Sequence, residues 1–259
     1  MTSMGTVDWV DRRGGDLAFS ERLKFVYHGV RALAATKKRI RQSVKFRHME
    51  FEDIVPPDSA IAMEAMAFCR ETSAPFLFNH CLRSYFWARL LDDGSGPVDQ
   101  EVLFTALMLH DIGMNEGYVL DPSDKYKCFT IVGARIARDL AMRHGWSEKR
   151  ADLTANAITL HLNIAINNEF GREAALTRIG SGGDIAGLGL DVLHKDQINS
   201  VVGAYPRLDL SRKILPVIER EAKERPCCRL AFMHKKLGFS SLIRHSRFTD
   251  RNGVDRGES

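Results

Sequence analysis

Helical periodicity is the strongest pattern in the sequence. From residue 59 to about residue 190, apolar residues recur at three- and four-residue steps, and glycine and proline mark the loops between the periodic segments. No segment shows the convincing alternation of polar and apolar residues that a half-buried strand would have. The segment 99–110 is apolar on nearly every side, so we expect it to lie at the centre of the molecule. The sequence therefore predicts an all-α fold with a central helix that ends at His110.

The periodic segments also suggest how the chain is divided. Pro56 and Pro57 stop any preceding helix, so residues 1–55 are expected to form an N-terminal helical extension. We expect a core at 56–190, C-terminal helices that pack on it at 191–247, and a disordered tail at 248–259. The expected helices cover residues 19–41, 59–72, 75–91, 99–110, 130–144, 147–162, 172–188, 195–204 and 211–224.

Composition excludes several classes of protein. The 259 residues are 44% hydrophobic and 27% charged, which is ordinary for a globular chain with a sizeable core. No run of about 18 apolar residues is present, and the first residues lack the apolar centre of a secretory signal. Five cysteines form neither a zinc-binding spacing nor a disulfide framework. We therefore expect a cytoplasmic protein with reduced thiols and no contact with a membrane.

Positive charge is concentrated in one segment, residues 37–47. This segment holds six basic residues and no acidic one, although the net charge of the chain is only +4. It could bind an anionic partner, or it could be a solvated amphipathic face. We favour the solvated face, because aromatic residues do not alternate with the basic ones as binding to a single strand would require. Binding to nucleic acid is not expected.

An adjacent histidine and aspartate provide the best candidate for a metal site. His110 and Asp111 stand at the end of the predicted central helix and offer a nitrogen and a hard oxygen donor from one turn. Asp111 could instead simply end the helix.

Three further residues offer compatible chemistry. His80 lies early in an apolar helix, where a buried imidazole needs a partner. Asp184 stands in a small, apolar segment, where its charge needs either a metal or an arginine beside it. His161 lies on the apolar stripe of its helix and could equally be a core histidine bonded to a backbone carbonyl. A metal ion held by such groups, with one position open, lowers the pKa of bound water to about 7.

Several short motifs carry a resemblance to a known family. The segments 78–85 (FNHCLRSY), 107–113 (LMLHDIG) and 183–187 (GDIAG), in this order, resemble the HD-domain superfamily of metal-dependent hydrolases. The segments 57–59 (PDS), 157–161 (AITLH) and 205–207 (YPR) are similar to the cyanamide hydratase-like branch of that superfamily. The resemblance covers about residues 56–239 and implies an HD-domain helical bundle with helical extensions.

The resemblance also implies roles for individual residues. The implied metal ligands are His80, His110, Asp111 and Asp184, with one divalent transition metal, zinc preferred and iron as the alternative. Asp111 and His161 would be the catalytic residues, with His161 as a general acid and base because its unperturbed pKa of about 6.5 suits proton transfer. Residues expected to bind substrate or to support the ligands are Asn79, Arg83 and Lys125.

The implied activity is hydration or hydrolysis of a small molecule. A metal-bound hydroxide would attack a small nitrile-like carbon, as in the conversion of cyanamide to urea, so the enzyme would be a hydro-lyase or a hydrolase. Two alternatives stay open: a phosphohydrolase that acts on a nucleotide or another phosphate ester, and a non-catalytic module that binds through the basic N-terminal helix. Thr130, Val132 and Met114 depart from residues common in relatives, so the substrate could differ and one metal is favoured over two. The oligomeric state stays open, with a homo-oligomer as one alternative.

Overall fold

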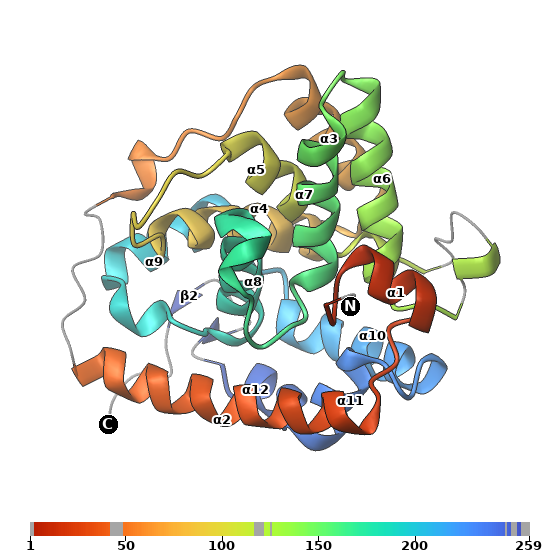
Figure 1. The fold of residues 1–259 in the computed structure, drawn as a ribbon. Coiled ribbons are helices and arrows are strands. Elements are labelled where there is room, and N and C mark those ends of the chain that lie inside the picture. The colour runs from red at the N-terminus through yellow and green to blue at the C-terminus, as the bar shows by residue number, and fades with distance from the viewer. Residues whose placement is uncertain are drawn as a thin grey trace.

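The fold is built from α-helices joined by short loops and turns of 3-10 helix (Figure 1). The computed structural model describes residues 3–41, 49–116, 122–124, 126–246, 248–249 and 253–254. The helices among these residues are α1 (Val7–Arg13), α2 (Phe19–Arg41), α3 (Ala60–Thr72), α4 (Pro75–Leu90), α5 (Gln100–Leu109), α6 (Thr130–Arg143), α7 (Glu148–Leu160), α8 (Gly171–Ala186), α9 (Lys195–Ala204), α10 (Leu210–Glu224), α11 (Arg229–Lys236) and α12 (Phe239–Arg244). The predicted all-α class is confirmed.

The helices agree closely with the periodic segments of the sequence. Each of the nine expected helices is present, with ends that differ by no more than two residues. Helices α1, α11 and α12 were not expected, because they are only seven, eight and six residues long. A short helix offers too few turns for a hydrophobic period to stand out from its surroundings.

Helix α5 lies at the centre of the core, as its apolar sequence predicts. Every residue from Val102 to Leu109 is buried, and α4, α6, α7 and α8 pack around the helix. Its first turn is fixed by Asp99, whose carboxylate accepts a hydrogen bond from the backbone N–H of Val102. The carboxylate also receives two hydrogen bonds from Arg150 of α7. These contacts fix where α5 begins. They therefore also fix the position of His110, which follows the last turn of α5.

Two glycines allow the helices around the site to approach closely. A Cβ atom at Gly180 of α8 would lie 2.1 Å from the carbonyl oxygen of Ser84 in α4, and one at Gly133 of α6 would lie 2.0 Å from that of Leu109 in α5. Both positions therefore require the absence of a side chain. Close packing of α8 on α4 brings Asp184 to His80, which explains the glycine-rich sequence of α8.

Helix α2 runs along one side of the molecule, beside α11 and α12 in Figure 1. Its first turn is held by Glu21, which accepts a hydrogen bond from the indole N–H of Trp9. Phe25 is buried against Phe232 of α11, with their ring centroids 6.1 Å apart. Other side chains of α2 are far more exposed, including Val30 at 63%. The helix is thus attached near its N-terminal end and covers the body of the molecule loosely.

Two short strands follow α12. Residues 248–249 pair with residues 253–254 as antiparallel strands, β1 (Phe248–Thr249) and β2 (Gly253–Val254). Phe248 is buried, and the guanidinium of Arg207 lies 3.9 Å from the centre of its ring. The disorder expected for residues 248–259 and the proposed boundaries at residues 55, 190 and 247 stay predictions.

No helix among the described residues is both long and apolar enough to cross a lipid bilayer.

Candidate metal centre

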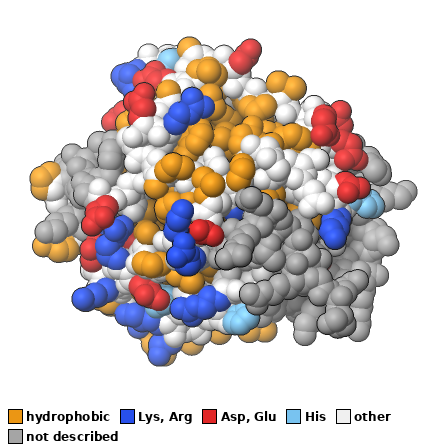
Figure 2. Space-filling model, turned by 180° about the vertical axis from the view of Figure 1, so that it is seen from behind, with side chains coloured by type: hydrophobic (Ala, Val, Ile, Leu, Met, Phe, Trp, Pro, Cys, Tyr) orange, Lys and Arg blue, Asp and Glu red, His pale blue; other side chains and the backbone are white. Residues whose placement is uncertain are grey.

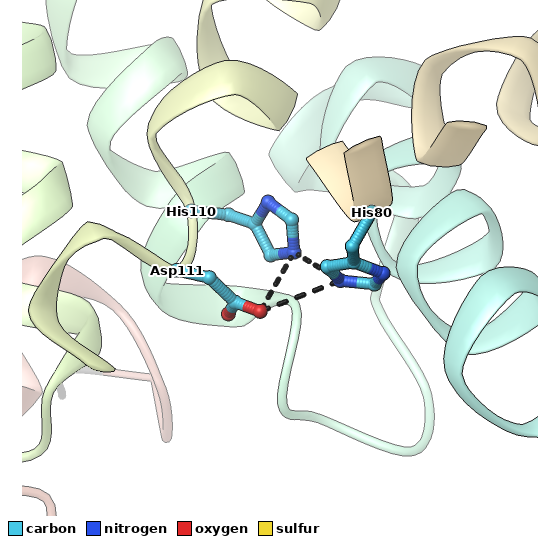
Figure 3. A group of neighbouring side chains, drawn as sticks. All are labelled: His80, His110 and Asp111. Atoms are coloured by element: carbon cyan, nitrogen blue, oxygen red, sulfur yellow. Dashed lines mark hydrogen bonds and ion pairs between the residues drawn. The ribbon is translucent and has the colours of Figure 1, made fainter. Parts of the chain in front are cut away.

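Three predicted ligands meet at one point in the core (Figure 3). His80 comes from the middle of α4, whereas His110 and Asp111 follow the last turn of α5. The Nε2 atoms of the two histidines are 3.2 Å apart, and Oδ2 of Asp111 lies 3.3 Å from Nε2 of His80 and 3.4 Å from Nε2 of His110. All three residues are buried. The structure thus brings two nitrogens and one oxygen together, although His110 and Asp111 lie 30 and 31 positions after His80 in the sequence.

The other ring nitrogen of each histidine is held by an acceptor. Nδ1 of His110 donates a hydrogen bond to the carbonyl oxygen of Leu107 at 2.8 Å, and Nδ1 of His80 donates to Oδ2 of Asp184 at 2.8 Å. This leaves the Nε2 lone pairs directed at one another and at Asp111. Two lone pairs and a carboxylate face one another favourably only if a cation lies between them. The pattern is typical of metal-binding histidines, whose second nitrogen is oriented by a backbone or carboxylate oxygen.

His161 stands beside this group in the same orientation. It follows the last turn of α7, and its Nδ1 donates to the carbonyl oxygen of Ile158 at 2.6 Å. Its Nε2 lies 3.7 Å from Oδ1 of Asp111, the carboxylate oxygen that the two other histidines do not approach. His161 is therefore bonded to a backbone carbonyl and also faces the site, and its catalytic role stays a prediction.

Asp184 lies beside His80. Its carboxylate contacts Nδ1 of His80 and lies outside the group formed by His80, His110 and Asp111. It accepts two hydrogen bonds from Arg83 and one from the indole N–H of Trp87, at 2.7–2.8 Å. A second guanidinium, that of Arg207, bonds to the backbone oxygen of Asp184 at 2.9 Å. In this structure Asp184 orients His80, and its direct ligation of a metal stays a prediction.

The charges at the site follow from burial and close partners. Burial disfavours a proton on His80, but hydrogen bonds to Asp111 and Asp184 outweigh it and raise the pKa of His80 to about 9. Burial lowers the pKa of His110 and lowers that of His161 to about 3. Burial would raise the pKa of Asp111, yet His110 and His80 hold it well below its usual value. The protein without a metal thus places a proton on His80, where a cation would otherwise sit.

A divalent transition metal fits this group of donors. Imidazole nitrogen and carboxylate oxygen are donors that zinc and iron both accept, so the group does not distinguish between these two ions. The donor atoms lie within 4.8 Å of one another and come from buried residues of α4 and of the end of α5. Coordination by these three residues would leave at least one position open on a four-coordinate ion, as in catalytic sites.

The predicted supporting residues have mainly structural contacts. Arg83 is fully buried and donates to Asp184 and to the carbonyl oxygens of Tyr205 and Pro206. Asn79 donates to the carbonyl oxygen of Pro206 at 2.8 Å. Neither side chain reaches the metal group in this structure, and Arg83 supports it through Asp184. Lys125 lies outside the described residues.

Sequence reasoning missed two residues that hold Asp184. Trp87 could have been found, because residues 80, 83 and 87 lie on one face of a helix and so point to the same neighbour. Arg207 stands in the segment 205–207 that carries the resemblance, but nothing in the sequence indicated its contact with Asp184, because it lies in the loop between α9 and α10 and reaches Asp184 only through the tertiary fold.

A cavity of about 560 Å³ adjoins the metal group. His80, His110, Asp111 and His161 line part of it, and most of the remaining lining is hydrophobic. Arg178 is the one lysine or arginine among the described residues of the lining. The site thus opens into a space that is both large and weakly charged.

Metal affinity below neutrality should depend on pH through a single proton. His80 is protonated below about pH 9 without a metal, whereas the lowered pKa values of His110 and Asp111 leave these ligands already deprotonated at neutral pH. A metal must displace the His80 proton, so we expect the affinity to rise about tenfold per pH unit below neutrality and more steeply above it, where the metal-bound water also loses a proton. Titration against a competing chelator would measure this slope. A flat profile below neutrality would contradict the assignment.

Replacing Asp184 with asparagine should weaken metal binding without abolishing it. Loss of the partner that orients a metal-binding histidine commonly costs about 10- to 100-fold in affinity. Asp111→Asn should cost far more, whereas Asp152→Asn, at an exposed ion pair with Arg138, should have no effect. Metal titration of the three variants compares these outcomes.

Two outcomes of that titration are informative about the role of Asp184. If Asp184→Asn removes binding as completely as Asp111→Asn, Asp184 is a direct ligand. Should Asp184→Asn fail to fold, because Arg83 and Arg207 are left without their buried counter-charge, Trp87→Phe provides a milder version of the test. It removes one hydrogen bond to Asp184 and should lower the affinity less than tenfold.

Comparison with known proteins agrees with the geometry of the site. Residues 77–185 match the family model of the HD domain, and this stretch includes His80, His110, Asp111 and Asp184. The chain is 24% identical over 178 residues to cyanamide hydratase DDI2 and to cyanamide hydratase DDI3, both of Saccharomyces cerevisiae. Each alignment covers 67% of this chain and 77% of the yeast protein. Through residues 77–185 the chain is thus similar to the HD-domain family, and over most of its length it resembles two cyanamide hydratases.

Proposed function

We propose that this protein is a metal-dependent enzyme that adds water to a nitrile-like carbon, as in the conversion of cyanamide to urea. The observation that carries the proposal is the convergence of His80, His110 and Asp111, with both histidines oriented through Nδ1. The similarity to two cyanamide hydratases supports the choice of reaction. Zinc as the metal, a cytoplasmic location and a homo-oligomeric state stay predictions.

His80, His110 and Asp111 would hold the metal, with His161 beside them. A bound divalent ion supplies a water molecule whose pKa is lowered towards neutrality. The protein contributes a fixed arrangement of donors, because the ligands are buried within α4 and at the end of α5 and cannot reorient freely. The ligands themselves are buried, which strengthens electrostatic interactions among them.

His161 is the group best placed to move the proton. With its Nδ1 proton bonded to Ile158 and its pKa lowered to about 3, the ring is neutral and presents Nε2 as an acceptor. It would take a proton from water as the oxygen forms its bond to carbon, and would return that proton to the nitrile nitrogen. The carboxylate of Asp111, 3.7 Å away, would stabilise the ring while it carries the proton. One water is consumed, and the imidic acid formed first becomes the amide by tautomerisation.

The cavity favours a neutral substrate over a phosphate ester. Phosphoryl transfer requires several positive groups around the transferred phosphate, and Arg178 is the one lysine or arginine among the described lining residues. Lys127, on the loop before α6, is engaged with Asp11 and Asp124. A phosphohydrolase remains the alternative with less support.

The non-catalytic alternative has little support among the described residues. Residues 42–48 of the basic segment lie outside the described part of the chain, so its surface is not characterised. On the face shown in Figure 2, Lys and Arg side chains lie among Asp and Glu side chains and do not form a separate basic patch. In a module without a metal there would also be no physical reason for His80, His110 and Asp111 to be buried facing one another.

The test is hydration of cyanamide by the metal-loaded protein. We expect urea to form at a rate that falls to background when a chelator removes the metal and recovers when zinc or iron is restored. Release of phosphate from a panel of nucleotides should stay at background under the same conditions. Phosphate release without urea formation would establish the alternative, and the absence of both would overturn the proposal for small nitriles.

The role of His161 can be tested in the same assay. His161→Gln should retain the metal and lower kcat by at least about 100-fold, the usual contribution of a general acid or base. His144→Gln is the matched control, because His144 pairs with Glu64 on the surface and does not line the cavity. Loss of the metal from His161→Gln would make His161 a ligand instead.

A further inference from the structure

The cavity is much larger than cyanamide requires. Cyanamide has three non-hydrogen atoms, and at about 30 Å³ for each, the share of one water in the liquid, it would occupy roughly 90 Å³. The cavity measures about 560 Å³, within the range of sites that hold drug-sized ligands. Most of the space would stay empty of substrate if cyanamide alone were bound.

Water is a poor occupant for the remainder. Ordered water in a cavity needs polar partners, whereas most of the wall away from the metal group is hydrophobic, as at Ile179, Ile214 and Leu230. The polar residues of the remaining lining are Asn163, Arg178, Ser181 and Asp191. Four large hydrophobic side chains that line the cavity remain considerably exposed: Val26 at 39%, Val30 at 63%, Leu188 at 45% and Leu242 at 44%. An apolar molecule in the cavity would remove this surface from water, which is favourable at about 25 cal/mol for each Å².

These side chains come from several helices that enclose the space. Val26, Gly29 and Val30 of α2 form one wall, and residues of α8, α10, α11 and α12 form others. At Gly29, helix α2 faces the cavity without a side chain. A Cβ at Gly29 would lie 3.5 Å from Cδ1 of Ile164, an ordinary contact, so the backbone there does not demand glycine. The absence of a side chain at Gly29 therefore leaves space for a ligand.

We propose that the natural substrate joins a compact polar head, which reaches His161 and Asp111, to an apolar body that fills the cavity beneath α2. The inference rests on the proposed function and specifies its substrate class: a neutral organic nitrile of roughly ten to fifteen non-hydrogen atoms, at about 30 Å³ each. The reaction converts R–C≡N and one water into R–C(=O)–NH₂. No oxidant or reductant is involved. Cyanamide would correspond only to the polar head of the preferred substrate.

A series of primary amides, the products of such a reaction, tests the inference by binding. Acetamide, butanamide, hexanamide and octanamide are titrated into the full-length protein by calorimetry. We expect the Kd to fall about fourfold for each methylene added, because a buried methylene contributes that factor in apolar surroundings. A Kd that does not change along the series would overturn the proposal.

Substitutions of two glycines locate the binding. Gly29→Leu fills the cavity from α2 and should weaken octanamide by at least tenfold while leaving acetamide unchanged. Gly203→Leu is the matched control: Gly203 is an exposed glycine of α9 with no atom near its Cβ position, so octanamide binding should be unchanged. Should Gly29→Leu fail to fold, Gly29→Ala provides a smaller change in the same direction. Equal binding by wild type and both Gly29 variants would contradict the location.

The outcomes separate this inference from the proposed function. Nitriles with the same chains are assayed for turnover alongside the amide titrations. Hydration of cyanamide without any effect of chain length would leave the proposed function intact and overturn the inference. Length-dependent binding of amides that Gly29→Leu abolishes, with no turnover of any nitrile, would support the apolar site and overturn the proposed reaction.

Discussion

The hydrogen bond from Nδ1 of His80 to Asp184 is the interaction on which the metal centre depends. It determines the tautomer of His80 and turns its Nε2 towards His110 and Asp111. Asp184 can serve this role because Arg83 and Trp87 hold both of its oxygens. The close packing of α8 on α4, which Gly180 permits, brings these groups within reach. The packing of α8 on α4 thus determines how the imidazole ring of His80 is oriented.

The balance of charge at the site explains why it would hold a cation. Asp184 has Arg83 and Arg207 beside it, so its buried charge is compensated within the protein. Among the described residues, the ion-pair partners of Asp111 are histidines, and the burial of an unpaired carboxylate is costly. Without a metal, a proton on His80 compensates the charge of Asp111. The raised pKa of His80 reflects this protonation. A divalent ion would replace that proton and use the same three donor atoms.

The sequence predicted the fold class and the long helices because hydrophobic periodicity is a local signal. It also predicted His80, His110 and Asp111 as neighbours, through motifs that carry the family resemblance. It did not predict that Asp184 would lie behind His80, because whether a carboxylate contacts a metal or an arginine depends on distances of a few ångströms between helices. Phe248 and Arg207, which anchor the tail, meet only in the folded chain.

The cavity was also beyond the reach of the sequence. Its walls come from helices at both ends of the chain, and the exposed valines of α2 looked like ordinary positions of an amphipathic helix. The sequence left two enzymatic alternatives open, a small nitrile-like substrate and a phosphate ester. The structure shows a space beside the metal group that is broad and mostly apolar, and this directs attention to larger neutral substrates.

X-ray absorption spectroscopy of the metal-loaded protein, with the metal content measured on the same sample, tests the central claim most directly. The account predicts about one equivalent of metal with imidazole nitrogen and carboxylate oxygen at about 2.0–2.2 Å if the ion is zinc. It also predicts that the imidazole contribution falls in a His80→Gln variant. Less than about half an equivalent after metal is supplied, or a spectrum without imidazole, would contradict the assignment of His80, His110 and Asp111 as the metal centre.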